Sequence, residues 1–440
     1  LFGGRVTTLT ELDLRTLTNS GNAAYLAELN LSGRLTNNAS GVLSVEADLT
    51  ADSLVNNGLI AVRTGTPTMS FTGAGGLTGT GSFCLETLGD DALCNGAGSS
   101  GTGLVLGQAG DSTFDGAFVG LGTLEKQGGG TLTLTAAQSF SGGLFVNDGA
   151  MVTQASSSAT FHDELDIEVG AGGALSLNTP DDIGALTVRG QATVNADQTV
   201  ASATASGGGL SLNADITTEA QGAFNVVNSG GATGRVSIDG DRVISASGGL
   251  SGDGSVELTQ GSSLELRQAG AISTFDGTIS GGTGTALTID GAERLVLNGS
   301  AGQIDVDALT ILRGTLVLDG SELLVNTIAV DVRGVNSRLE LANHSDPGVA
   351  RTQTIASLDG AGFIDLGRNT LDVTNGGSFD GEFFGEGSVN VANGAFTITQ
   401  SLTSSQGTLD VSNSAGTTVG AGSSVDVRRV QVNSQGVLNV

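Results

Sequence analysis

The feature that most constrains the fold of this chain is a short recurring phrase, a glycine followed by a run of alternating residues. It occurs at residues 41–45, 130–134, 173–177, 314–318, 407–411 and 436–440. A period of two places Leu132 and Leu134 on one face of a strand and the threonine between them on the other face. Glycine at the corner permits backbone angles that a side chain forbids. The phrase therefore predicts many short strands, each entered through a glycine corner.

A longer unit also repeats, and each copy joins a Gly-x-Gly turn to a Phe-Asp-Gly triplet. The triplets are Phe114-Asp115-Gly116, Phe275-Asp276-Gly277 and Phe379-Asp380-Gly381. Repeats that cannot bury their own faces stack on their neighbours, which leaves a parallel β-helix or a β-propeller as candidate architectures. The copies are unequal in length, and the chain has one Tyr and no Trp. Both observations argue against the regular, aromatic-rich blades of a propeller.

We therefore expect an all-β fold, a right-handed parallel β-helix, built as a single elongated rod from one continuous region, residues 1–440. Glycine interrupts most windows long enough for a helix, so helix signals are nearly absent. The exception is residues 20–30, where Ala23–Leu29 predicts a short helical or irregular piece. Strands at the ends of such a rod lack one neighbour, so edges near Leu1 and Val440 predict continuation of the sheets or end-to-end self-association.

Cys84 and Cys94 are the only two cysteines. Their spacing is too wide for a Cys-x-x-Cys redox motif, and no histidine lies near them for zinc. We expect a loop-closing disulfide and an oxidising compartment, with two buried free thiols as the alternative. Both cysteines lie among surplus residues of the first long repeat, so residues 84–102 are predicted to be an insertion that projects from one coil.

The charge of the chain excludes polyanionic partners. It carries 45 acidic and 17 basic residues, a net charge of -28, so neither nucleic acid nor anionic lipid is an expected partner. No apolar run of about 18 residues is present, and no direct membrane insertion is expected. Outward Asp and Glu residues also keep strand faces from docking on each other.

Candidate catalytic residues are few. Gly110-Asp111-Ser112 is similar to a turn that presents a serine nucleophile, but Ser112 holds the same repeat position as Ser273. The two histidines, His162 and His344, belong to unrelated segments.

Carboxylate pairs are the signature of a polysaccharide hydrolase, and acidic residues also assist a lyase. The pairs near likely turns are Asp90-Asp91, Asp163-Glu164 and Asp181-Asp182. The first and third have no adjacent Arg, His or aromatic stacking platform. We expect no enzyme activity, and a β-helical polysaccharide lyase or hydrolase, or a tailspike-like glycan binder, is the alternative.

Metal-binding patterns are equally sparse. His162-Asp163-Glu164, with Asp166 close by, is an acidic segment for which a solvated loop is the expected structure. The calcium-binding nonapeptide requires Gly-Gly-x-Gly-x-Asp in tandem, and residues 248–253 miss that spacing by one and stand alone. No cofactor is expected, and calcium has no support beyond this near match.

One segment resembles a known family. Residues 124–152 are similar to the autotransporter-associated β-strand repeat of type V secreted passenger domains. The matching positions are Lys126, Gly128, Gly130, Leu132, Leu134, Phe140, Gly142, Gly143, Asn147 and Gly149, with Phe114-Asp115-Gly116 as the usual lead-in. The other copies keep Phe-Asp-Gly but lose the lysine. The resemblance implies a right-handed β-helical passenger that is exported through the periplasm to the surface or exterior of a Gram-negative bacterium, often adhesive and usually followed by a membrane barrel.

Together these features predict a surface or secreted adhesin, a structural passenger that acts as scaffold and spacer in attachment or biofilm matrix. The expected partners are a host or neighbouring-cell surface, a matrix polysaccharide or a protein. The main alternative is an extracellular fibre subunit that stacks end to end. Barrel signals such as aromatic girdles are missing, so we expect a fragment of a longer passenger or a secreted relative without a barrel.

Overall fold

The structure is a computed structural model that describes residues 6–8, 12–25, 28–86, 94, 100–154, 160–270, 272–342, 349–400, 402–412, 415–420, 425–433 and 435–439. These residues form strands and turns, and no helix occurs among them. The part of the chain that the structure describes thus holds no helix long and apolar enough to cross a membrane. Two compact units make up the chain, Leu1–Ile216 and Thr217–Val440.

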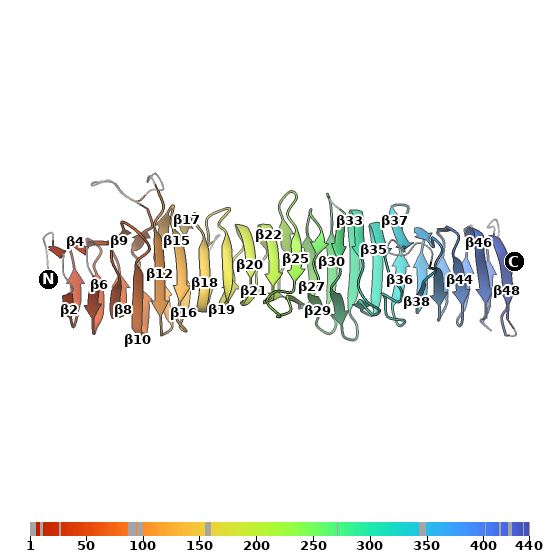
Figure 1. The fold of residues 1–440 in the computed structure, drawn as a ribbon, viewed down its shortest axis with the longest axis horizontal. Helices are drawn as coiled ribbons and strands as arrows, with labels where there is room; N and C mark the ends of the chain where they lie inside the picture. The colour runs from red at the N-terminus through yellow and green to blue at the C-terminus, as the bar shows by residue number, and fades with distance from the viewer. Residues whose placement is uncertain are drawn as a thin grey trace. The chain divides into compact units, whose positions relative to one another are not determined.

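The first unit is a stack of coils whose strands pair in parallel with those of the coils before and after (Figure 1). One coil consists of β5 (Leu29–Leu31), β6 (Arg34–Asn37) and β7 (Val42–Val45), and the next coil pairs with it through β8 (Leu49–Asn56) and β9 (Leu59–Val62). One sheet of this unit contains β1 (Val6–Thr8), β4 (Asn22–Tyr25), β7, β9, β11 (Ser82–Cys84), β14 (Ala117–Gly120) and β17 (Ser139–Phe140). This arrangement confirms the predicted parallel β-helix.

The second unit repeats the same architecture. One of its sheets contains β31 (Ser273–Phe275), β33 (Ala286–Leu297), β35 (Ala308–Leu318), β37 (Ser337–Leu341), β40 (Phe363–Asp365) and β43 (Glu382–Phe384). Strands β33 and β35 are long enough to turn a corner and contribute to two sheets. Coil lengths vary across the chain, from 17 residues between the paired Leu186 and Ala203 to 37 between the paired Met69 and Leu106, an interval that contains both cysteines.

The interior consists of ladders of aliphatic side chains. In the first unit Leu124, Leu144, Ile167 and Leu186 lie over one another in successive coils, and all are at most 1 % exposed. Each buried leucine contributes about 2 to 3 kcal/mol relative to an exposed one. The alternation predicted from sequence is correct, because the paired inward residues Leu132 and Leu134 are both fully buried.

The corner glycines are required for two different reasons, and the sequence predicted only one of them. Gly314 has φ +82°, a conformation that favours glycine. Gly130 does not have a positive φ, but a Cβ atom there would lie 2.2 Å from the carbonyl oxygen of Gly110 in the preceding coil. Close stacking of backbone on backbone thus fixes glycine at this corner.

In the long repeat, each Phe-Asp-Gly triplet stacks on the Gly-x-Gly turn of the preceding coil. In each copy the aspartate N–H donates to the carbonyl of the first turn glycine, at 3.0 Å for Asp115 to Gly79, 2.8 Å for Asp276 to Gly252 and 2.7 Å for Asp380 to Gly360. Phe114, Phe275 and Phe379 are fully buried. A Cβ atom on the triplet glycine, Gly116, Gly277 or Gly381, would lie 1.9 or 2.0 Å from a carbonyl oxygen of that turn.

Residues 20–30 are not helical where the structure describes them. Asn22–Tyr25 forms β4, which pairs in parallel with β7, and Leu29 begins β5. The helical prediction was wrong here because pairing with the next coil outweighs the weak local helix preference of an alanine-containing segment. Residues 26 and 27 lie outside the described residues.

A ladder of buried asparagines stabilises one corner of the first unit. Asn19 Nδ2 donates to Asn37 Oδ1 at 2.9 Å, and Asn37 Nδ2 donates to Asn56 Oδ1 at 2.9 Å and to the Leu59 carbonyl at 3.1 Å. All three asparagines are at most 2 % exposed. A Cβ atom at Gly41 would lie 2.2 Å from Asn37 Oδ1, so glycine at 41 makes room for the ladder.

We predict that Asn37→Ala lowers the free energy of unfolding by about 2 kcal/mol, because it leaves buried donors and acceptors without partners. Urea denaturation followed by circular dichroism measures the change. Asn57→Ala is the matched control: Asn57 is exposed, and a loss below about 0.5 kcal/mol is expected there. Equal losses in the two variants would contradict a stabilising role for the ladder.

Candidate functional site

The family-like segment spans little more than one coil of the first unit. It contains β15 (Thr123–Gln127), β16 (Thr131–Leu134), β17 and most of β18 (Leu144–Thr153). Its apolar motif residues Leu132, Leu134 and Phe140 are fully buried. Among its glycines, Gly128, Gly143 and Gly149 have positive φ, whereas Gly130 and Gly142 lie against the backbone of the coil before.

Lys126, the only lysine in the chain, is the least expected of the motif residues, because it occupies an inward position. Leu106 and Val146 are its partners in the neighbouring coils, and its side chain is fully buried. The ammonium donates to the carbonyl of Gln127 at 2.9 Å, to that of Gly128 at 2.7 Å and to that of Asp148 in the next coil at 3.4 Å. Lys126 therefore ties two successive turns together.

Burial and the neighbouring charges have opposite effects on the pKa of Lys126. Burial lowers the pKa of Lys126 from 10.5 to about 8, while the charges of Asp148 and Asp111 act to raise it. Asp111 accepts a hydrogen bond from the Thr131 N–H, which lowers the pKa of that carboxyl group. The lysine is thus a buried structural cation held by carbonyl oxygens.

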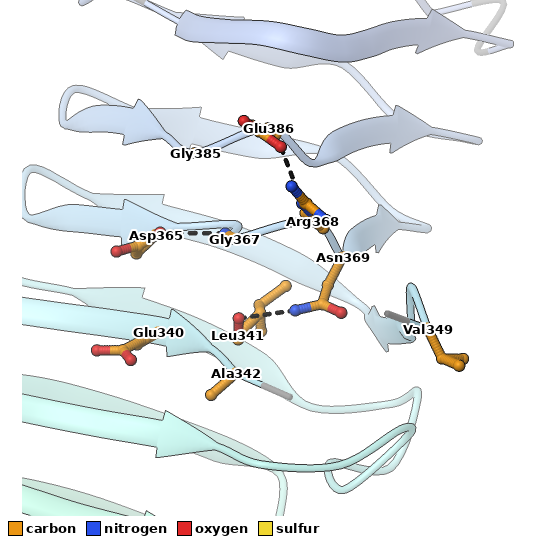
Figure 2. A pocket seen from close by; sticks show the side chains of 10 residues that line it. All are labelled: Glu340, Leu341, Ala342, Val349, Asp365, Gly367, Arg368, Asn369, Gly385 and Glu386. Atoms are coloured by element: carbon orange, nitrogen blue, oxygen red, sulfur yellow. Dashed lines mark hydrogen bonds and ion pairs between the residues drawn. The ribbon is translucent and has the colours of Figure 1, made fainter. Parts of the chain in front are cut away.

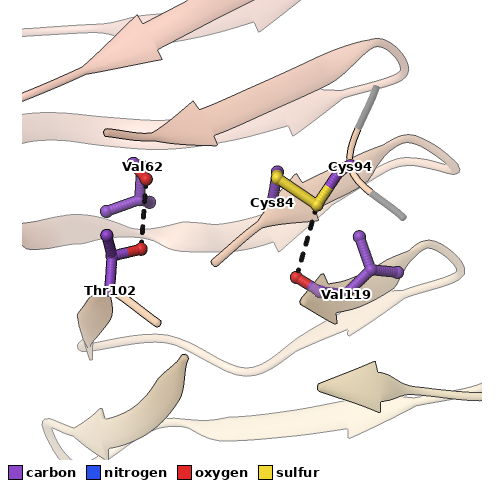
Figure 3. The surroundings of a disulfide bond; sticks show 5 residues. All are labelled: Val62, Cys84, Cys94, Thr102 and Val119. Atoms are coloured by element: carbon purple, nitrogen blue, oxygen red, sulfur yellow. Dashed lines mark hydrogen bonds between the residues drawn. A yellow bond between two sulfur atoms is a disulfide. The ribbon is translucent and has the colours of Figure 1, made fainter. Parts of the chain in front are cut away.

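Cys84 and Cys94 form a disulfide in the structure, with Cα atoms 5.6 Å apart (Figure 3). Cys84 ends β11 and is fully buried, and Cys94 Sγ lies 3.6 Å from the Val119 carbonyl oxygen in the next coil. A disulfide sulfur carries no hydrogen, so this is a contact and not a hydrogen bond.

Within the predicted insertion, residues 84–102, an antiparallel bridge joins Glu86 to Gly101. Thr102 then donates to the Val62 carbonyl at 3.1 Å and directs the chain into β12 (Gly103–Gln108). Residues 87–93 and 95–99, on which the predicted projection depends, lie outside the described residues.

Among the described residues, Cys84, Glu86 and Cys94 are the one group of three potential metal ligands that converges. Both sulfurs are consumed by the disulfide, and a metal site requires thiolates. The segment containing His162, Asp163, Glu164 and Asp166 does not converge into such a group, and all four side chains are exposed.

The candidate nucleophile has a structural role. Ser112 Oγ accepts a hydrogen bond from the Leu77 N–H at 3.1 Å, across the long-repeat turn. His162 lies elsewhere, on a hollow of about 340 Å³ that Cys94 and Val119 also line. His344 lies outside the described residues.

The Asp181-Asp182 pair is split between two faces of β20 (Asp181–Val188), because adjacent residues of a strand point in opposite directions. Asp181 is buried and accepts hydrogen bonds from the Phe161 N–H at 2.9 Å and the Thr179 hydroxyl at 3.2 Å. Burial raises the pKa of its carboxyl group. Asp182 is exposed, so the two carboxylates do not flank a common substrate position. Asp90 and Asp91 lie outside the described residues.

A hollow of about 560 Å³ with both polar and apolar walls lies in the second unit, where the chain leaves the carboxyl ends of β37, β40 and β43 (Figure 2). Its charged lining residues are Glu340, Asp365, Arg368 and Glu386. Arg368 Nε donates to Glu386 Oε2 at 2.9 Å on its rim. In its wall, buried Asn369 donates to the Leu341 carbonyl at 2.7 Å and so links two neighbouring coils.

The sequence-based interpretation missed an aromatic pair beside this hollow. Phe363 and Phe384 occupy outward positions in neighbouring strands, with ring centroids 5.8 Å apart, and Arg338 lies over the Phe384 ring at 4.9 Å. The signal was present in the alternation, because Phe363 flanks buried Ile364 and Phe384 follows buried Phe383. Without the coil register, however, nothing in the sequence places the two rings together.

We predict that the folded-state pKa of Lys126 is about 8. The unfolded chain binds this proton more tightly, so the contribution of Lys126 to stability rises between about pH 8 and 10.5 and is constant below that window. Because the chain has one lysine, NMR titration of ¹³C-labelled lysine gives a single ε-carbon curve that measures the value. Lys126→Met removes that resonance and confirms its assignment, and a titration midpoint at or above 10.5 would contradict the prediction.

The disulfide predicts that no thiol of the folded or denatured chain reacts with iodoacetamide until a reductant is added, after which both cysteines react. Intact mass measurement follows the labelling. The double variant Cys84→Ala/Cys94→Ala is expected to lower the free energy of unfolding by about 2 to 3 kcal/mol, since it frees the closed loop in the unfolded chain. Labelling of the unreduced, denatured protein would show that the pair is not bonded.

Comparison with the curated proteins finds no match, and comparison with the solved structures finds none either. One family does match: residues 124–152 are similar to the passenger-associated-transport-repeat. These are the residues whose burial, positive φ angles and buried lysine are described above. This repeat within a β-solenoid fits the passenger of an autotransporter with β-helix repeats.

Proposed function

We propose that this chain is the β-helical passenger region of an adhesin on the surface of, or secreted by, a Gram-negative bacterium, where it serves as scaffold and spacer. The observation that carries the proposal is the passenger-associated-transport-repeat at residues 124–152, set within a parallel β-helix. Such a repeat is not typical of enzymes.

The physical properties of the two units support a scaffold. Each coil adds backbone hydrogen bonds and a layer of aliphatic side chains to the coil before, so stability accumulates with coil number. Outward positions are mostly polar, and the net charge of -28 keeps the surface soluble. Among the described candidate residues, Ser112 and Asp181 accept hydrogen bonds from backbone N–H groups, which also favours a non-catalytic role.

The partners that suit this role are a host or neighbouring-cell surface, or a polysaccharide or protein of a biofilm matrix. A fibre built by end-to-end stacking stays a second prediction, and electron microscopy of the purified chain distinguishes regular filaments from isolated particles.

The surface location is tested with an epitope inserted between Gly230 and Gly231 in the source bacterium. This turn is exposed, and a Cβ atom at either glycine would meet nothing within 4 Å. We expect antibody to label intact cells as strongly as permeabilised ones. Labelling that requires permeabilisation would place the chain inside the cell and refute the passenger assignment.

The adhesive role is tested in the same strain. Deletion of the gene is expected to reduce attachment to abiotic or cellular surfaces, and the epitope-tagged gene is expected to restore it. If the tagged strain is fully labelled at its surface but the deletion strain attaches as well as the parent, the passenger assignment stands and the adhesin role is refuted.

A further inference from the structure

We propose that the hollow of the second unit, together with Phe363 and Phe384, is a binding site for a neutral oligosaccharide. This goes beyond the scaffold role, and it is argued from the outward face of β37, β40 and β43 and from the turns that follow them.

The aromatic pair is the first observation. Of the 14 phenylalanines among the described residues, 11 are buried, and Phe145, Phe363 and Phe384 are the three that are not. Two of these three lie on adjacent strands of one sheet with their rings in contact. Both rings are half-buried, and the exposed part of an aromatic ring is apolar surface that a bound ligand removes from water. The pair thus forms an apolar platform on an otherwise polar face.

Charged groups surround this platform in a fixed order. Register pairs Arg338 with Phe363, Glu340 with Asp365, and Asp365 with Phe384. Arg338 lies over the Phe384 ring and 3.8 Å from Asp365 Oδ2. An arginine held between a ring and a carboxylate keeps its orientation, so its remaining N–H groups point in defined directions.

The hollow adjoins the platform directly. Asp365 lines the hollow and follows Phe363 by two residues on the same face of β40, while Gly385 lines it and follows Phe384. Asp365 Oδ1 accepts a hydrogen bond from the Gly367 N–H at 3.0 Å, which fixes the carboxylate. Glu386 and Arg368 pair across the rim at 2.9 Å. A ligand spanning both parts meets an apolar surface at one end and planar donors and acceptors at the other.

This combination matches a sugar better than other ligands. A pyranose ring has a face of C–H groups that packs on an aromatic ring, whose face is electron-rich, and an edge of hydroxyl groups that suits carboxylates and guanidinium groups. The hollow, at about 560 Å³, lies within the range of small-molecule sites.

The balance of charges around the hollow and the two rings favours a neutral sugar over a charged one. Arg368 is paired with Glu386, Arg338 with Asp365, and Arg294 with Glu340 at 2.9 Å. Three cations are therefore matched by three carboxylates, and no net positive charge is left for a uronate or sulfate group. The hydroxyl groups of a neutral hexose or N-acetylhexosamine hydrogen bond to such pairs without breaking their charge balance.

The test uses the purified full chain on an array of neutral and acidic oligosaccharides, followed by calorimetric titration of the best neutral ligand. We expect a neutral oligosaccharide to bind with a Kd of millimolar or tighter. Phe363→Ser/Phe384→Ser is expected to weaken binding at least about tenfold, and Arg368→Gln/Glu386→Gln to weaken it as well.

Phe145→Ser is the matched control, since Phe145 is the third phenylalanine that is not buried and lies in the first unit. It should leave the Kd unchanged, and circular dichroism should show that all variants keep the β signal and melting temperature of the parent. The inference is overturned if no neutral oligosaccharide binds, if only acidic glycans bind, or if the Phe363/Phe384 variant binds as the parent does. None of these results bears on surface location, which the epitope experiment tests separately.

Discussion

The rest of the structure depends on the in-register stacking of parallel strands, in which each coil places its backbone directly over that of the coil before. Adjacent strands in such a stack lie about 4.8 Å apart, so residues at equivalent positions must tolerate each other at that distance. Where the chain bends, backbone approaches backbone even more closely. This is why a Cβ atom at Gly116, Gly277 or Gly381 would lie about 2 Å from a carbonyl oxygen. The glycine content follows from this geometry as much as from positive φ angles.

Stacking also decides how polar groups are accommodated inside the coils. A buried amide is satisfied when the same residue type recurs one coil later, as in the ladder of Asn19, Asn37 and Asn56. A lone buried cation requires carbonyl oxygens from two turns, as Lys126 has. The asparagine ladder and the Lys126 hydrogen bonds both connect turns of successive coils. Both also replace the hydrogen bonds to water that these polar groups lose on burial.

The sequence was sufficient to predict the fold because strand alternation and glycine spacing are local signals, and both are read directly from neighbouring residues. The helical prediction near Ala23 failed because pairing between coils, a non-local interaction, outweighed local preference. The Phe363 and Phe384 platform was missed for the same reason. These residues are 21 positions apart, and only the coil register, in which Asp365 lies beside Phe384, brings them together. Asp181 and Asp182 show the converse, since adjacency in sequence suggested a pair that the strand separates.

A solenoid divides its residues into inward positions, which the stacking restricts, and outward positions, which it leaves nearly unrestricted. Departures from the repeat at outward positions therefore carry more information about function than the repeat itself. Two phenylalanines beside an arginine are such a departure, because the neighbouring outward positions of this sheet carry charged residues such as Glu340 and Asp365. Lys126 also departs from the repeat, because it stands at an inward position that elsewhere holds an aliphatic residue. Its hydrogen bonds to carbonyl oxygens of two turns explain it structurally. The two phenylalanine rings contact each other, and Arg338 lies over one of them. A ligand that covers their exposed part removes the remaining apolar surface from water.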